Sequence, residues 1–286
     1  FGGTAVRAAL ALQFLGSAAL LGAPQGDHAG HFAHLGVLIA FVLVPAPLLA
    51  LGLGAYGPRE VLRRLPGLWT ALAMATLAPL LASEIVTGGC LDPVGTADAL
   101  ITLLPGLGIG LVWAAGVSRL RSPGQRIAAW FSLLLASVVA ALLPLLLGPA
   151  VFVLHAVIGA FPGPIYDRAF ALRDAFLWHR ALHLLGALAI LGALRVRGGQ
   201  GRARVAVAPA LAGVLVLIAL GPLLGTTPSA GSLARCLPLA QAHRGLTLHL
   251  DPRRTPPGVA ESLWQDARLA YDEAAARLGV EGRADL

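Results

Sequence analysis

Histidine is the residue type whose positions in this chain most suggest chemistry. His179 and His183 are four residues apart, so in a helix they share one face, the spacing that lets two imidazoles reach one metal ion. Three further histidines recur at every third position, which spreads them over about 120° of a helix but lets them converge in a loop. The candidate metal-ligand set is His28, His31, His34, His155, His179 and His183.

These imidazoles are candidate ligands of a transition metal, with zinc, copper or a haem iron as the bound metal. Asp27, Glu84 and Asp167 are candidate oxygen ligands, or partners that orient the histidines. The alternative is that the histidines lie in the polar headgroup layer of a membrane and bind no metal. The chain contains no HExxH, no CxxC and no other linear metal motif, so both interpretations stay open.

A second candidate site pairs a carboxylate with an arginine. Glu84 lies near the end of an apolar segment, where an unpaired carboxylate costs free energy. Arg180 lies at the corresponding depth of a later apolar segment and is the expected partner. A structural ion pair, or exposure of these groups to lipid headgroups, is favoured over a proton relay.

Cys90 and Cys236 are the only cysteines of the chain. Both are expected on the outer side of a membrane, where disulfides persist. A bond between them would tie an interhelical loop to the carboxyl-terminal segment, and two free thiols are the alternative.

The sequence GAFPGPIYDRAF at 159–170 is the most unusual local stretch. Pro162 and Pro164, next to glycine, force a turn, and Tyr166 can anchor at a membrane interface beside the charge of Asp167. We expect a rigid re-entrant turn that leads into the next helix. The functional alternative is that this turn and the nearby histidines line one outward-facing pocket. No GxSxG motif supports a serine nucleophile.

The composition of the chain restricts the elements that can position these residues. Apolar residues make up 57% of the 286 positions and charged residues 12%, well below the roughly 25% charged residues of soluble domains. The net charge of +7 does not indicate a nucleic-acid binder, because the arginines stand in short runs between apolar blocks and not on one soluble face. The expected partner is a lipid bilayer, with no nucleic acid.

Seven apolar stretches are long enough to cross a bilayer, which takes about 20 helical residues. Their continuity favours helices over a strand barrel, whose segments alternate apolar and polar positions. The first stretch has features of a secretory signal, but its length favours a membrane helix. The predicted fold is all-α, a polytopic transmembrane helix bundle with helices at 4–23, 35–56, 65–87, 97–117, 127–147, 175–194 and 205–225.

Arginine falls in every second connection between these stretches, and short basic loops stay on the cytoplasmic side of a membrane. The alternation predicts an amino end inside, a carboxyl end outside and all eight histidines on the outer side. All 21 basic residues are arginine, which indicates a bacterial genome of high GC content. The expected location is therefore a bacterial inner membrane.

Prolines inside the stretches remove backbone donors and favour kinks. They are Pro45, Pro47, Pro79, Pro105 and Pro144. Gly106, Gly108 and Gly110 lie in the middle of the fourth stretch, with no strand before them and no lysine after them. They therefore indicate close helix packing and not a phosphate loop.

The composition changes after residue 226. We assign 1–226 to the membrane bundle, 227–245 to a linker and 246–286 to an extracytoplasmic α/β segment, with a strand at 246–250 and a helix at 257–279 that buries one apolar stripe. One strand and one helix cannot form a core of their own. The segment is expected to begin a larger, truncated domain or to dock on the membrane part.

The CLDP loop at 90–93, the FPGPIYD turn and the tail RGLTLHLDPRRTPPGVAESLWQDARLAYDEAAARLGV resemble bacterial multi-pass membrane proteins that continue into a gluzincin-like peptidase MA domain. Such domains begin with a strand and a long helix, to which residues 246–279 are similar. The resemblance implies a zinc peptidase whose HExxH motif this chain does not contain, so no catalytic residue is carried over.

The leading hypothesis for function is an integral membrane protein that anchors or scaffolds an extracytoplasmic domain. One alternative is a membrane-tethered zinc metallopeptidase, and another is a transporter or permease subunit. The chain shows no internal repeat and few polar residues at mid-membrane positions, which disfavours a transporter. The sequence establishes no reaction, substrate or protein partner.

Overall fold

The computed structural model describes residues 2–19, 31–87, 93–147, 152–162, 174–199, 204–224, 226, 239–243, 246–250 and 256–278. The chain divides into two compact units, Phe1–Thr226 and Thr227–Leu286. The first unit is almost entirely helical, and the second combines a strand hairpin with one helix. Each unit is described by itself.

Helices in the first unit fall on all seven of the predicted apolar stretches. They are α1 (Gly2–Ala19), α2 (His31–Leu43), α3 (Pro45–Leu53), α4 (Pro58–Thr87), α5 (Pro93–Val117), α6 (Pro123–Leu147), α7 (Asp174–Arg197), α8 (Arg204–Ala219) and α9 (Gly221–Leu224). The stretch around Pro45 is broken there into two helices that bend by 41°, because proline has no N–H to continue the backbone ladder. By contrast, α4 continues through Pro79 and α5 through Pro105.

Four helices are long and apolar enough to cross a membrane. The qualifying segments are Pro58–Ala82, Leu100–Val117, Pro123–Leu143 and Phe176–Arg197. The bent pair α2–α3 would add a fifth if it is one span, and the described apolar part of α8, Val207–Ala219, is shorter. Within the described residues, length and composition therefore give four or five spans where the sequence predicts seven.

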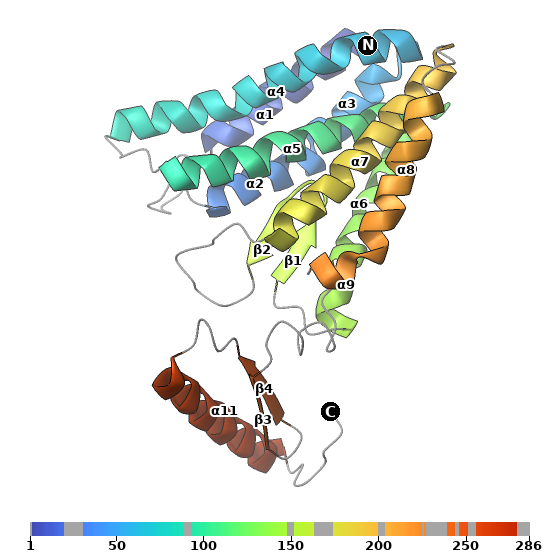
Figure 1. The fold of residues 1–286 in the computed structure, drawn as a ribbon. Coiled ribbons are helices and arrows are strands. Elements are labelled where there is room, and N and C mark those ends of the chain that lie inside the picture. Colours follow the sequence, from blue (N-terminus) through green and yellow to red (C-terminus); the bar gives the residue numbers. More distant parts are fainter. Residues whose placement is uncertain are drawn as a thin grey trace. The chain divides into compact units, whose positions relative to one another are not determined.

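Helix α5 occupies the centre of the first unit and packs against α2, α3, α4 and α7 (Figure 1). Its inward side chains Leu103, Leu107 and Ile109 join one buried cluster with Leu38 and Phe41 of α2. Around this centre, α1 packs on α3 and α4, and α8 packs along α7. The fold is thus a helix bundle built on one apolar core.

Large apolar side chains also cover the outside of the bundle. Leu135 on α6 is 65% exposed and Leu215 on α8 is 67% exposed. Similar exposed residues occur on α1, α4 and α7, among them Leu15, Met74 and Leu188. Water would disfavour such a surface, whereas lipid is its natural solvent.

A strand hairpin connects α6 to the region before α7 (Figure 1). Strand β1 (Phe152–His155) pairs antiparallel with β2 (Gly159–Pro162), and His155 lies opposite Gly159. Val157, in the three-residue turn between them, is fully buried in the apolar core. The turn lies against α5 within the candidate span Leu100–Val117, because a Cβ on Gly106 would lie 2.4 Å from the Val157 carbonyl oxygen.

The glycines of α5 permit the close approaches that the sequence predicts. A Cβ on Gly110 would lie 2.6 Å from the ring of Phe41 on α2, and one on Gly108 would lie 3.3 Å from the indole of Trp69 on α4. Gly106 faces the hairpin turn. One helix thus uses three glycines to admit three different neighbours.

In the second unit, β3 (Leu239–His243) pairs antiparallel with β4 (Leu246–Leu250), and α11 (Pro257–Leu278) packs on β4. Strand β3 lies in the segment 227–245 that the sequence analysis assigns to a linker, because LAQAH finds a partner in LTLHL. Leu263 and Leu269 of α11 are 44% and 69% exposed. The prediction of a buried stripe is wrong at these positions, since one hairpin covers too little of the helix.

Candidate functional site

His155 is a predicted site residue whose two ring nitrogens both have described partners. It is buried at the end of β1, where its Nε2 lies 2.9 Å from the hydroxyl oxygen of Ser137 on α6. Its Nδ1 accepts hydrogen bonds from the backbone N–H groups of Val157 (3.2 Å) and Ile158 (3.1 Å). The imidazole therefore joins the hairpin turn to α6.

These contacts assign the proton of the neutral imidazole. Nδ1 receives two N–H donors and so carries no proton, which leaves the proton on Nε2. The Ser137 hydroxyl donates its own hydrogen to the carbonyl of Leu134 (2.7 Å) and accepts from His155 Nε2. In this arrangement His155 cannot take the serine proton, so the pair is structural and not a nucleophile with its base.

Arg180 is buried where α7 meets the hairpin and α5. Its Nη1 donates to the carbonyl of Ala156 (2.5 Å), and its Nη2 donates to the carbonyl of Thr102 (2.9 Å). Both nitrogens also approach the Val157 carbonyl at 3.5 Å, and the guanidinium lies 5.1 Å from the ring centre of Phe176. One side chain thus links α7, the hairpin turn and α5.

His155 and Arg180 together supply partners for four backbone groups of the hairpin turn. The imidazole accepts from two of its N–H groups, and the guanidinium donates to two of its carbonyls. A buried backbone group without a partner costs about 1–3 kcal/mol, and the turn has no helical ladder to supply partners. These two residues, with Ser137 and Thr102, therefore form a polar junction that lets non-helical backbone enter the bundle.

His179 and His183 lie one turn apart on α7, with ring centres 4.5 Å apart in an edge-to-face arrangement. The Nε2 atom of His179 is buried and has no hydrogen-bond partner among the described residues. No three His, Cys, Asp or Glu side chains in the described part of the chain are grouped so as to hold a metal ion. The nearby His155 uses both ring nitrogens in the junction.

Several predicted site residues lie outside the described residues. Cys90, Cys236, His28, Pro164, Tyr166 and Asp167 belong to segments that the structure does not describe. His31 and His34 lie in α2, Glu84 in α4 and Pro162 in β2, but their side chains are likewise outside the described set. The predicted disulfide and the predicted partner of Arg180 therefore stay predictions. The described partners of Arg180 are backbone carbonyls.

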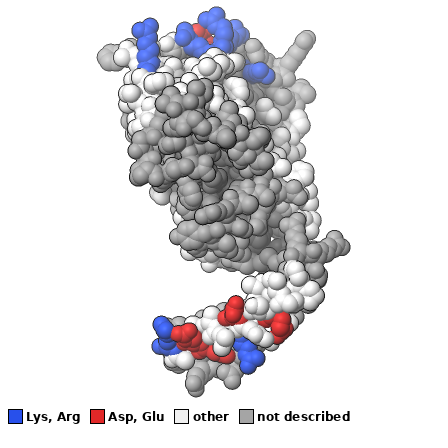
Figure 2. All heavy atoms as spheres, turned by 90° about the vertical axis from the view of Figure 1, so that its left-hand side faces the viewer, with Lys and Arg blue, Asp and Glu red and all other residues white. Residues whose placement is uncertain are grey.

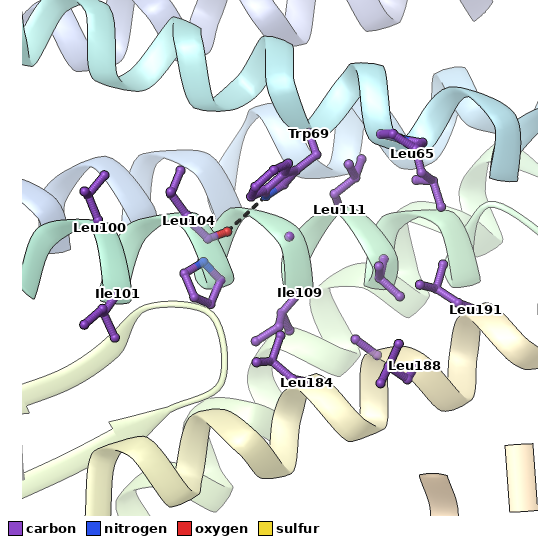
Figure 3. Close-up of a pocket in the computed structure, with 15 residues that line it drawn as sticks. Leu65, Trp69, Leu100, Ile101, Leu104, Ile109, Leu111, Leu184, Leu188 and Leu191 are labelled. Carbon is purple, nitrogen blue, oxygen red and sulfur yellow. Dashed lines mark hydrogen bonds between the residues drawn. The ribbon is translucent and has the colours of Figure 1, made fainter. Parts of the chain in front are cut away.

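A cavity of about 760 Å³ lies between α4, α5 and α7, and its lining is apolar (Figure 3). From α4 it is lined by Leu65 and Trp69, and from α7 by Leu184, Leu188 and Leu191. The indole N–H of Trp69 donates to the carbonyl of Leu104 at 3.1 Å, so the one polar side-chain group in the lining is satisfied. The cavity suits a hydrocarbon ligand and offers no group for acid–base chemistry.

Arginines gather at one end of the bundle, as the face drawn in Figure 2 shows. This basic end comprises Arg7, Arg59, Arg63, Arg64, Arg119, Arg121, Arg126, Arg195 and Arg197. Contacts join its parts: Arg59 donates to the carbonyl of Gly198 beyond α7, and Arg119 donates to the carbonyls of Tyr56 and Leu53 at 2.8 Å each. Burial, and then the charges of Arg126 and Arg197, lower the pKa of Arg119.

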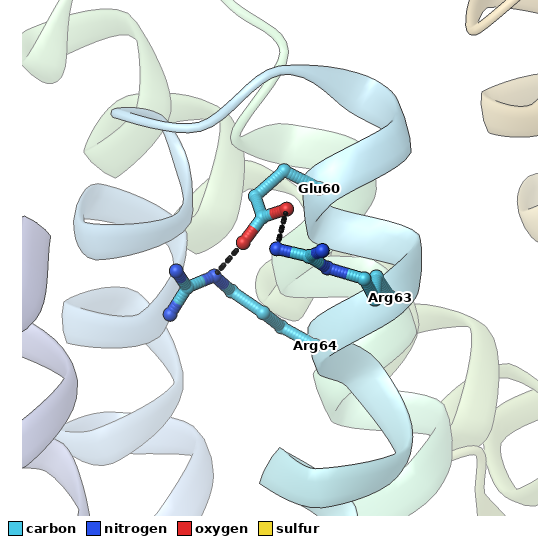
Figure 4. Close-up of polar contacts among 3 residues, drawn as sticks. All are labelled: Glu60, Arg63 and Arg64. Atoms are coloured by element: carbon cyan, nitrogen blue, oxygen red, sulfur yellow. Dashed lines mark hydrogen bonds and ion pairs between the residues drawn. The ribbon is translucent and has the colours of Figure 1, made fainter.

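Glu60 is the acidic side chain described at this end, and it bridges two arginines (Figure 4). Its carboxylate lies 2.6 Å from Arg63 and 2.6 Å from Arg64. Arg64 also stacks on Tyr56, with its guanidinium carbon 4.2 Å from the ring centre. Glu60 offsets one of the nine arginine charges at this end, so the basic end keeps a net positive charge that suits anions such as lipid phosphates.

His155 and Arg180 stand out in the sequence, whereas their partners Ser137 and Thr102 do not. A lone serine or threonine in an apolar helix has no signal of its own, because its hydroxyl or carbonyl can bond within the helix. The groups that complete the junction become visible only when α5, α6 and the hairpin are in place. No family model, no curated protein and no solved structure matches this chain.

Proposed function

We propose that the first unit is an integral membrane bundle that anchors the second unit at a membrane surface. The observation that carries this proposal is the distribution of side chains on the bundle. Leucines such as Leu135 and Leu215 are exposed along its sides, while the nine arginines of the basic end lie together at one end. A bilayer requires this division between hydrocarbon and headgroups.

We propose further that the bundle has seven spans, with the amino end in the cytoplasm and the carboxyl end outside. Two observations support this: α1 and α8 carry exposed apolar side chains such as Leu15 and Leu215, and the arginine-bearing connections share one end. Short basic connections are generally retained on the cytoplasmic side. The arginine-only composition supports a bacterial inner membrane. In this arrangement, the polar junction lies toward the outer half.

The test is extraction and topology of the full chain in bacterial cells. We expect the protein to stay with membranes through alkaline carbonate washing and to dissolve only in detergent. A reporter enzyme that works only outside the cytoplasm should be active when it is fused after Leu278. A reporter that works only in the cytoplasm should be active when it is fused after Arg121. Recovery in the carbonate supernatant would refute the anchor, whereas reversed reporters would refute only the orientation.

A transporter or permease subunit is a second candidate, and one observation favours it. The β1–β2 hairpin brings non-helical backbone beside a candidate span, held by the buried Arg180, and re-entrant segments of this kind often line transport pathways. Ion or proton flux into proteoliposomes should then depend on Arg180. Equal flux with wild-type protein and with empty vesicles would exclude this candidate.

The link to zinc peptidases rests on the order of elements in the second unit, where strand β4 is followed by the long helix α11. The exposed side chains Leu263 and Leu269 leave that helix with room for further polypeptide. Reading the gene past Leu286 tests this proposal, since an HExxH motif would support it. A different domain there would end it.

A further inference from the structure

The cavity between α4, α5 and α7 is elongated along the helices. Along α5 it extends from Leu100 to Val112, about 18 Å at 1.5 Å per residue. Half of a hydrocarbon layer of about 30 Å is about 15 Å. The cavity therefore spans roughly the depth of one acyl chain.

The two ends of the cavity lie at different distances from the basic end of the bundle. One end of the cavity is lined by Val112 of α5, Leu65 of α4 and Leu191 of α7. This end lies nearer the basic end of the bundle, because an arginine lies four to seven residues from each of them along the same helix or just beyond it. These arginines are Arg119, Arg59 and Arg195, respectively. The opposite end, at Leu100, lies away from the basic end, where the candidate span Leu100–Val117 begins. A bound chain would thus run inward from the basic end.

Two arginines continue the cavity-lining faces of their helices. Leu184, Leu188, Leu191 and Arg195 recur at intervals of four, three and four residues, which keeps all of them on one face of α7. Arg59 is seven residues before the lining residue Pro66, and its Nε already donates to the Gly198 carbonyl at the end of α7. Both residues therefore lie on the helix faces that lead to the cavity, and among the described residues the only side-chain hydrogen bond of the two is that of Arg59 Nε.

We propose that this cavity binds one acyl chain of an anionic phospholipid, whose phosphate is held by Arg59 and Arg195. The proposal rests on the membrane location proposed above. The lining is apolar and Leu188 is 55% exposed, so a chain can enter from the side. The positive charges of Arg59 and Arg195 on the faces that lead to the cavity favour an occupant with an anionic headgroup.

The first experiment asks whether the cavity holds lipid. Native mass spectrometry of the detergent-purified full chain should detect bound phosphatidylglycerol when this lipid is added. Leu188→Trp, which narrows the cavity, should weaken that binding by about tenfold. Leu135→Trp is the matched control, because Leu135 is exposed on α6 and does not line the cavity, and it should bind like wild type.

The second experiment asks whether the phosphate is recognised. The double variant Arg59→Gln/Arg195→Gln should bind phosphatidylglycerol about 30-fold more weakly, from about 1 kcal/mol for each arginine near a membrane surface. Arg121→Gln, an exposed arginine of the same end that lies in the turn after α5, is the control and should change binding little. Phosphatidylcholine, which has no net charge, should bind the wild type about as weakly as phosphatidylglycerol binds the double variant.

Three results would overturn the inference. Equal binding of phosphatidylglycerol by wild type and Leu188→Trp would place the lipid elsewhere. A loss of binding in Arg121→Gln as large as that in the double variant would make the attraction to arginine nonspecific. A dimer of the chain that dissociates in Leu188→Trp would assign the cavity to a second copy. Each of these leaves the membrane anchor intact, whereas a protein that carbonate releases from membranes would remove both proposals.

Discussion

Gly106 in α5 lies so close to the hairpin turn that a Cβ atom on it would be 2.4 Å from the carbonyl oxygen of Val157. The same Cβ would lie 3.0 Å from the side chain of Leu38. This contact fixes the depth to which the hairpin enters the bundle. It also brings the turn within reach of Arg180 and its partner Thr102.

Gly106→Ala should therefore destabilise the bundle, because the added methyl must displace a backbone carbonyl. We expect a loss of about 1–3 kcal/mol, the range for overpacked cores. Gly67→Ala is the control, since no atom lies within 4 Å of its Cβ position and alanine is the better helix former. Thermal unfolding in detergent compares the two, and equal midpoints would contradict the close contact.

Arg180→Met should destabilise the protein strongly, because it removes the donors to the carbonyls of Ala156 and Thr102. Each buried carbonyl left without a partner costs about 1–3 kcal/mol. Arg180→Lys should recover only part of the loss, since an ammonium group cannot reproduce the planar fork. The exposed Arg121→Met is the control. Thermal midpoints within error of one another for Arg180→Met and Arg121→Met would argue against the junction.

The imidazole of His155 should carry its proton on Nε2. Selective ¹⁵N labelling of histidine, with His155→Gln to assign the signals, measures this directly by NMR in micelles. Ser137→Ala should remove the hydrogen bond to Nε2 and leave the tautomer unchanged, because the turn amides of Val157 and Ile158 still face Nδ1. A protonated Nδ1 in the wild type would show that the turn is arranged differently.

Gln13 on α1 and Thr76 on α4 should be energetically coupled. The Gln13 amide donates to the Thr76 hydroxyl at 2.9 Å in a buried contact, while its Oε1 has no partner among the described residues. Thr76→Val alone should destabilise, and Gln13→Leu should be close to neutral because it also removes the unsatisfied oxygen. A double-mutant cycle should give a coupling of about 0.5–1 kcal/mol. A coupling of zero would mean that the contact is not formed.

The sequence by itself determined that this chain is helical and suited to a membrane. Continuous apolar runs of about 20 residues can satisfy their backbone only as helices in lipid, and every predicted run falls on a helix. The glycines of the fourth run predicted the close approaches that the structure shows. The sequence predicted kinks at all the prolines alike, whereas the helix breaks before Pro45 and α4 and α5 continue through Pro79 and Pro105.

Only the tertiary structure decided what those helices enclose. The contacts of His155 and Arg180 are backbone groups of the β1–β2 turn and of α5, which no side-chain motif in the sequence can identify. The pairing of β3 with β4 and the cavity beside Trp69 likewise depend on segments that are distant or merely apolar in sequence. Local sequence fixes which backbone groups a helix satisfies internally, and only packing shows which groups supply the remaining partners.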